Sequence, residues 1–228
     1  TLRKRYPGKG LDGAILAGLE ELVALYLSRD WPRAGGGSLR IEKCLIDCGY
    51  KPKLAAAVKH KTGGTTVELF KGYGITAGKK PMSAYQRKPG EVHGHHWYCP
   101  LVKGTSEFPH LASDVNYWKS FVHERLLIAP GDPGAITLFG RAPLDHALFA
   151  RHISESETYT ETFGHGRTVR EWKLKPDKPD NHWLDGLAGC AAGASRCGVT
   201  PAGEPEKPKR KRVRLSDLQR KKNDGPIY

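Results

Sequence analysis

The first part of the chain has an amphipathic pattern of apolar positions. Asp12, a residue type that often caps helices, precedes a run in which apolar side chains recur at helical spacing, and Trp31-Pro32 follows that run. This pattern predicts a helix over residues 13–27. The apolar residues that carry it are Ile15, Leu16, Leu19, Leu22, Val23 and Tyr26.

The next segments alternate between strand-like and helix-like patterns. Residues 39–47 end in a short apolar run, and Gly49 interrupts the pattern. Residues 53–61 favour a helix, and residues 66–70 have the pattern of a second strand. A strand, a helix and a second strand with connections this short predict a βαβ unit, and therefore an α/β sheet.

The remainder of the chain continues this alternation. Residues 77–94 are rich in Gly, Pro, Lys and Arg, which predicts a loop. Two strand-like runs flank Gly164-His165-Gly166-Arg167 and predict a hairpin. In order, we expect a strand at 97–102, helix 114–128, strand 135–139, helix 144–153, strands 159–163 and 170–174, and a helix from Asp180 through Ala192.

The charge of the chain favours a polyanionic partner such as nucleic acid. The formal net charge is +13, from 37 Lys and Arg against 24 Asp and Glu, and the pI is about 9.6. Much of the excess lies in residues 207–222, where Asp217 is the single acid. We therefore expect one domain over residues 1–203, followed by a basic, disordered tail over residues 204–228.

Composition also excludes several classes of protein. The chain has no apolar run long enough to cross a bilayer and no signal peptide, which predicts a soluble, cytoplasmic protein without a membrane partner. Its five cysteines have no regular spacing, which argues against a disulfide framework and suits a reducing compartment.

The segment Asp180–Asp185 has the chemistry of a divalent-metal site. His182 and Asp185 are three residues apart, so they share one face of the expected helix. Asp185 lies on a run of small and apolar residues, where an ionised carboxylate is costly unless a metal or a basic partner compensates it. The alternative interpretation is that Asp180 only caps the helix and Asp185 is an exposed helical residue.

A second carboxylate, Asp47, ends the first strand of the βαβ unit. Sites in α/β sheets form at the carboxyl ends of strands, although an aspartate there is also a common cap for the following turn. Together with Asp180, His182 and Asp185, Asp47 forms a pattern that suits Mg²⁺ or Mn²⁺, because these hard cations prefer oxygen ligands. Such an ion activates water for phosphodiester hydrolysis.

Two further groups of residues have less specific patterns. One group of imidazoles and a thiol has the ligand types of zinc, but its spacing matches no firm zinc pattern, so we favour a polar loop or a DNA-facing strand. This group consists of His93, His95, His96, Cys99 and His110. The other group contains candidate phosphate contacts, each of which is also consistent with an ordinary solvated side chain: Lys71, Lys119, Arg167 and Lys173.

An ordered series of motifs resembles a known family. The series consists of Leu45–Tyr50, Phe70–Gly72, Asp114–Phe121, Gly131–Gly140, Glu171–Leu174 and Asp180–Asp185. Over about residues 12–200 it resembles the nuclease domain of the large terminase subunit of tailed phages, in the lambda-like branch. The order of the motifs is far more specific than any one of them.

The resemblance implies a ribonuclease H-like α/β fold with a mixed central sheet flanked by helices. It also implies cleavage of concatemeric double-stranded DNA by a metal-dependent endonuclease that uses two Mg²⁺ or Mn²⁺ ions. Carried over to this sequence, Asp47 is similar to the second acidic ligand and Asp185 to the last one, with Asp180 and His182 as neighbours that orient ligands or water. The implied partners are a packaging ATPase domain, the small terminase subunit and the portal, in the cytoplasm of the host.

The chain departs from the family pattern at its beginning. Family members place a first catalytic aspartate on an opening strand, and residues 1–10 supply none; the glycine-rich loop of the ATPase is also missing. The chain therefore resembles the later part of the nuclease domain. Two alternatives stay open, namely a non-catalytic DNA-binding or packaging-adaptor module and a related ribonuclease H-like resolvase or transposase.

Overall fold

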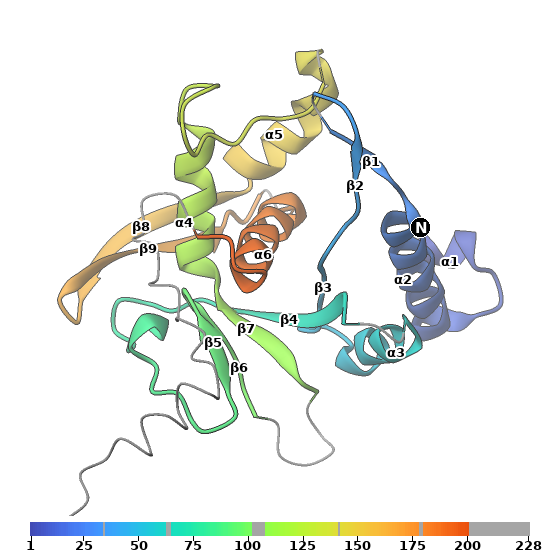
Figure 1. The fold of residues 1–228 in the computed structure, drawn as a ribbon, viewed down its shortest axis with the longest axis horizontal. Helices are drawn as coiled ribbons and strands as arrows, with labels where there is room; N and C mark the ends of the chain where they lie inside the picture. The colour runs from blue at the N-terminus through green and yellow to red at the C-terminus, as the bar shows by residue number, and fades with distance from the viewer. Residues whose placement is uncertain (34, 63–64, 102–107, 141, 178–179, 201–228) are drawn as a thin grey trace, which may run out of the picture.

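The computed structural model describes residues 1–33, 35–62, 65–101, 108–140, 142–177 and 180–200. It contains a five-stranded mixed sheet flanked by helices, in the order β3-β4-β7-β6-β5 (Figure 1). The expected α/β class with a mixed sheet is confirmed. The strands of this sheet are β3 (Cys44–Asp47), β4 (Val67–Tyr73), β5 (Val92–Gly94), β6 (Trp97–Cys99) and β7 (His110–Asp114).

The expected βαβ unit is present. Strands β3 and β4 are parallel, with Asp47 opposite Phe70, and α3 (Pro52–Thr62) connects them. Strand β7 is parallel to β4, whereas β6 is antiparallel to β7, and this combination makes the sheet mixed. The carboxyl ends of β3, β4 and β7 therefore lie at one edge of the sheet, which we call the carboxyl edge.

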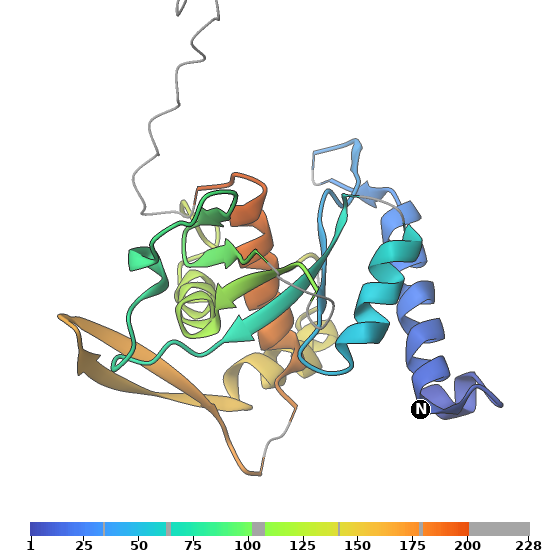
Figure 2. The ribbon, with the colours of Figure 1, turned by 90° about the horizontal axis from the view of Figure 1, so that it is seen from below.

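Helices cover both faces of the sheet (Figure 2). On one face, α2 (Gly10–Ser28) and α3 pack through Val23 and Val58 against Ile46 and Leu69. On the other face, α4 (Val115–Leu126) and α6 (His182–Arg196) pack against the sheet and against each other. That second core contains Phe70, Trp97, Leu111, Trp118, Ala188 and Ala192.

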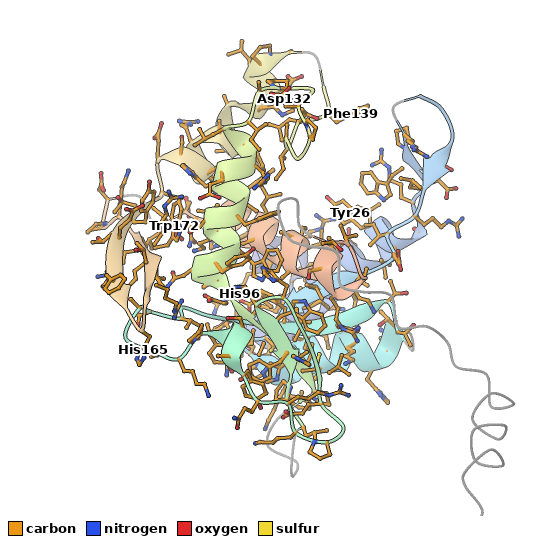
Figure 3. All side chains as sticks on the ribbon, turned by 60° about the vertical axis from the view of Figure 1, so that its left-hand side comes forward. Tyr26, His96, Asp132, Phe139, His165 and Trp172 are labelled. Atoms are coloured by element: carbon orange, nitrogen blue, oxygen red, sulfur yellow. The ribbon has the colours of Figure 1, made fainter. Side chains whose placement is uncertain are left out.

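The long hairpin β8 (Glu157–Gly164) and β9 (Arg167–Leu174) confirms the expected pair of strands. Its base packs on α4, where Trp172 lies against the helix, and His165 lies at its tip (Figure 3). The backbone N–H of Ala77 donates a hydrogen bond of 3.0 Å to Glu171, which ties the hairpin to the segment after β4. The hairpin is therefore held from two sides.

The remaining elements are short. They are α1 (Leu2–Arg5), β1 (Trp31–Pro32), β2 (Ser38–Leu39), the single 3₁₀ turns η1 (Met82–Ala84) and η2 (Pro143–His146), and α5 (Ala147–Ser154). Strands β1 and β2 form a separate antiparallel pair. In the described part of the chain, no helix combines the length and the apolar character that crossing a membrane requires.

Several expected boundaries were wrong. Residues 135–139 form no strand. The Ile136 N–H bonds instead to the carbonyl of Arg125 in α4, and Phe139 is 79% exposed. The strand-like end of residues 39–47 is β3, whereas Leu39 belongs to β2, and β6 ends at Cys99, before Pro100, which has no N–H to continue the ladder. Residue 102 and the expected tail over 204–228 lie outside the described residues.

Glu91, which is 2% exposed, links the end of η1 to β5. Its pKa lies below the ordinary value of 4.5, because the N–H of Lys88 donates to the carboxylate, and the hydroxyl of Tyr85 donates as well. A carboxyl group whose pKa is lower in the folded state stabilises the folded protein at pH values above the unfolded-state pKa. This stabilisation is lost as the pH falls through the folded-state pKa. We expect Glu91→Gln to destabilise the protein at about pH 6 and to cost less at about pH 3, measured by urea unfolding at both pH values. An equal cost at both would contradict this assignment.

Candidate functional site

Asp47 is an exposed carboxylate at the end of β3. One of its oxygens, Oδ1, accepts the Gly49 N–H at 2.9 Å, so the side chain caps the turn that leaves the strand. Cys48, the next residue, is buried, and its thiol pKa is raised first by burial and then by the Asp47 carboxylate, while Lys71 opposes the shift. Asp47 and Lys71 are therefore neighbours of Cys48 at the carboxyl edge.

Helix α6 brings Asp185 to the same edge. A Cβ atom added at Gly193 would lie 3.2 Å from Leu45, and one added at Gly189 would lie 4.0 Å from the Phe70 ring. Phe70 is the partner of Asp47 in the sheet, whereas Leu45 comes two residues earlier in β3. The earlier of the two glycines is therefore nearer to the end of β3, which means that α6 runs antiparallel to β3. Asp185 is one further turn toward the start of the helix, about 6 Å beyond Gly189 along the helix axis. The turn of α6 that carries Asp185 is therefore directed toward the end of β3.

Asp185 has a basic partner in Lys119 of α4. The Lys119 ammonium lies 2.7 Å from Asp185 Oδ1 and 2.6 Å from Oε1 of Glu157, the first residue of β8. The side chain of Asp185 is 48% exposed, whereas those of Lys119 and Glu157 are 8% and 2% exposed. Lys119 thus compensates the negative charge of Asp185. A basic partner is one of the two means of compensation that the sequence suggests.

The other two residues of the predicted metal motif lie apart from this pair. Asp180 and His182 have highly exposed side chains, with 3.9 Å between His182 Nε2 and Asp180 Oδ1. The expected cap is wrong, because the N-cap of α6 is Asn181 and no side chain caps this end of the helix. Within the described ranges, no three or more His, Cys, Asp or Glu side chains form a group that would hold a metal ion.

The donor chemistry of the edge nevertheless suits a hard cation. Mg²⁺ is often bound through only one or two carboxylates, with water and substrate phosphate as its other ligands. Asp47 and Asp185 supply two carboxylates, and one oxygen of each, Oδ1, is already hydrogen-bonded or ion-paired. The chemistry of these two side chains is therefore that of a partial set of ligands for such an ion.

The carboxyl edge also contains acidic residues that the sequence did not single out as site residues. Asp114, at the end of β7, is 1% exposed and caps α4 by accepting the N–H groups of Asn116 and Tyr117. It lies 3.5 Å from His96 Nδ1, and the His96 ring stacks on Tyr117. Glu157 was missed as well, since a glutamate after Ser156 matches no motif. Two histidines of the candidate zinc cluster, His95 and His96, thus form part of an aromatic cluster with Tyr117.

The four candidate phosphate contacts fall into two groups. Lys71 and Lys173 are exposed. Arg167 donates to the carbonyls of Thr76 and Lys79, and Lys119 lies in the interior between two carboxylates. Lys71 and Lys173 are therefore the members of the set whose charge faces solvent.

The fold and this edge define a mixed α/β domain that carries carboxylates at the carboxyl ends of its parallel strands, in a strongly basic chain. A family model described as "Terminase large subunit gpA, endonuclease domain" matches residues 18–205. The chain belongs to this family, as its ordered motifs suggested. No curated protein and no solved structure matches the chain.

Proposed function

We propose that the chain is the metal-dependent endonuclease domain of a viral DNA-packaging terminase, which hydrolyses phosphodiester bonds of concatemeric double-stranded DNA. The observation that carries this proposal is the approach of α6 to β3, which brings Asp185 to the edge where Asp47 ends its strand. Membership of the gpA endonuclease family supports the reaction class. The mixed sheet flanked by helices is consistent with a ribonuclease H-like fold.

In this proposal, Asp47 and Asp185 hold Mg²⁺ or Mn²⁺, and two ions take part in the reaction. When bound, such ions activate water and stabilise the leaving oxygen. A further carboxylate completes the set of ligands. Among the described residues β3 pairs with β4 alone and is an edge strand of the sheet, and in this proposal a further strand beside β3 carries this carboxylate next to Asp47.

The side chains around the edge have separate roles. Asp47 is held at the end of β3 by its bond to the Gly49 N–H, and in this proposal its second oxygen is a metal ligand. His182 begins α6 three residues before Asp185, and its exposed imidazole is available to orient water beside Asp180. Lys71 supplies positive charge next to this edge for a DNA phosphate.

The proposed substrate and partners follow from charge and family. A net charge of +13 favours the DNA backbone. A packaging ATPase domain, the small terminase subunit and the portal are the partners expected of a terminase nuclease domain, with the host cytoplasm as the place of action. Asp180 belongs to the outer part of the site, where its exposed carboxylate assists the ligands.

We expect Lys71→Ala and Lys173→Ala each to weaken binding to duplex DNA about equally for all sequences. Each substitution removes one exposed cation, so the salt dependence of log K should lose about one unit of slope per phosphate contact removed. The measurement is fluorescence anisotropy with labelled duplex at several salt concentrations. Lys53→Ala on α3 is the matched control, and equal losses in the control would show that the effect is general to surface charge.

A non-catalytic DNA-binding or packaging-adaptor module is the second candidate, because the described residues contain no group of three metal ligands. A third is a resolvase or transposase of ribonuclease H-like type. Incubation of linear and branched duplexes with Mn²⁺, then with EDTA, then with Mn²⁺ restored, separates these functions. Cleavage of linear duplex that stops and resumes supports the endonuclease, binding alone supports the module, and a preference for branched DNA supports the resolvase.

A further inference from the structure

Lys119 joins two carboxylates that differ greatly in their surroundings. Its ammonium contacts Glu157 on β8 and Asp185 on α6, at 2.6 and 2.7 Å. Glu157 has almost no solvent exposure, whereas about half of the Asp185 side chain is exposed. A buried carboxylate depends on its cationic partner much more than a solvated one does, because water cannot replace that partner. Glu157 therefore holds the Lys119 ammonium more strongly than Asp185 does, and the contact between Lys119 and Asp185 breaks more readily.

Glu157 has the capacity for a further bond. Its Oε1 accepts from both Lys119 and Asn181. Its Oε2 is buried and has no hydrogen-bond partner among the described residues. An unpaired buried acceptor is unfavourable, and the Lys119 ammonium, which has three donors, already contacts the same carboxylate through Oε1.

We propose that Lys119 is the resident counter-ion of Asp185, and that Glu157 retains this lysine when Asp185 is released to a metal ion. In the exchange, the ammonium leaves Asp185 and bonds more fully to Glu157, where Oε2 gains a donor. The inference rests on the proposed function, in which Asp185 is a metal ligand. It assigns Lys119 and Glu157 as positioning residues, in place of the DNA contact that the sequence suggested for Lys119.

The location of Asn181 strengthens the link to α6. Asn181 is the N-cap of that helix, and its side-chain amide donates to Glu157. Its carbonyl also accepts the N–H of Asp185. Glu157 thus contacts both the lysine that neutralises Asp185 and the residue that starts the helix on which Asp185 lies, so Asp185 stays in place while its counter-ion changes partner.

Neutral substitutions of the two positioning residues, Lys119 and Glu157, should change the affinity for Mn²⁺ in opposite directions. In Lys119→Met the ammonium no longer competes for Asp185, so Mn²⁺ should bind about tenfold more tightly. In Glu157→Gln the ammonium has Asp185 as its only anionic partner in this cluster, so Mn²⁺ should bind about tenfold more weakly. A purely structural role would weaken binding in both variants. The measurement is calorimetric titration of the purified chain with Mn²⁺ alone.

Three further variants complete the experiment. Lys119→Met/Glu157→Gln removes both buried charges and should resemble Lys119→Met, which keeps the test valid if the single variant does not fold. Lys43→Met is the matched control, because Lys43 forms a similar partly buried pair with Glu68 at the start of β3. Asp185→Ala should abolish the Mn²⁺ binding whose affinity the Lys119 and Glu157 variants change.

The outcomes separate this inference from the proposed function. If Mn²⁺ binding depends on Asp185 but Lys119→Met and Glu157→Gln shift it in the same direction or not at all, the counter-ion exchange is overturned and the metal site stands. If Asp185→Ala binds Mn²⁺ as the parent does, or the parent binds none, both are overturned. Opposite shifts, with Lys43→Met unchanged, support the exchange.

Discussion

Asp47→Asn is expected to lower metal-dependent DNA cleavage by about 100-fold or more while leaving DNA binding at low salt nearly unchanged. The substitution keeps the size of the side chain and its bond to the Gly49 N–H, but it removes the negative charge that a hard cation requires. Binding persists because the phosphate contacts come from lysines and arginines. The measurement is the rate of plasmid nicking in Mn²⁺, beside anisotropy on the same DNA.

The control for this prediction is Asp12→Asn. Asp12 is also an exposed aspartate, and it pairs with Lys51 at the start of α2, so its replacement changes the net charge equally. Cleavage by Asp12→Asn should match that of the parent chain. Retention of full activity by Asp47→Asn would remove Asp47 from the site.

Trp118→Ala is expected to be the most destabilising single substitution that we propose. Trp118 is 1% exposed and lies among Phe70, Leu111 and Ala188, where α4 and α6 meet the sheet. Truncating a buried tryptophan costs about 3–5 kcal/mol, whereas domains of this kind are stable by only about 5–15 kcal/mol. The measurement is the free energy of unfolding in urea.

Trp183→Ala provides the comparison for Trp118→Ala. Trp183 is 47% exposed on the first turn of α6, where it contacts Phe149, so we expect a cost of about 1 kcal/mol or less. Equal costs for the two tryptophans would contradict the location of the core between α4, α6 and the sheet.

The βαβ unit was predictable because its signals are local. An apolar run, a helix-forming run and a second apolar run with short connections admit few arrangements, and β3, α3 and β4 have the expected parallel order. The false strand at 135–139 shows the limit of such patterns. Its apolar residues satisfied the strand pattern, but the Ile136 N–H bonds to the end of α4, and no sheet partner is present in the described part of the chain.

The positions of Asp47 and Asp185 in their elements were predictable, whereas their role as a site stays a prediction. Asp47 ends a strand and Asp185 lies in the first turn of a helix, and the contacts of α6 with β3 direct the start of this helix toward the end of that strand. The link that Lys119 makes between Asp185 and Glu157 was not predictable, because Lys119 and Glu157 are 38 residues apart in sequence and meet only through the packing of α4 on the hairpin. The sequence indicates a phosphate contact at Lys119 because the burial of this lysine has no sequence signal.

The most direct test of the central claim is plasmid cleavage by the purified chain with Mn²⁺, Mg²⁺ or EDTA, beside Asp185→Ala. We predict nicking that requires the metal ion, stops with EDTA and is lost in Asp185→Ala while DNA binding remains. Metal-dependent cleavage that Asp185→Ala retains in full would contradict the assignment of the carboxyl edge as a metal-dependent nuclease site.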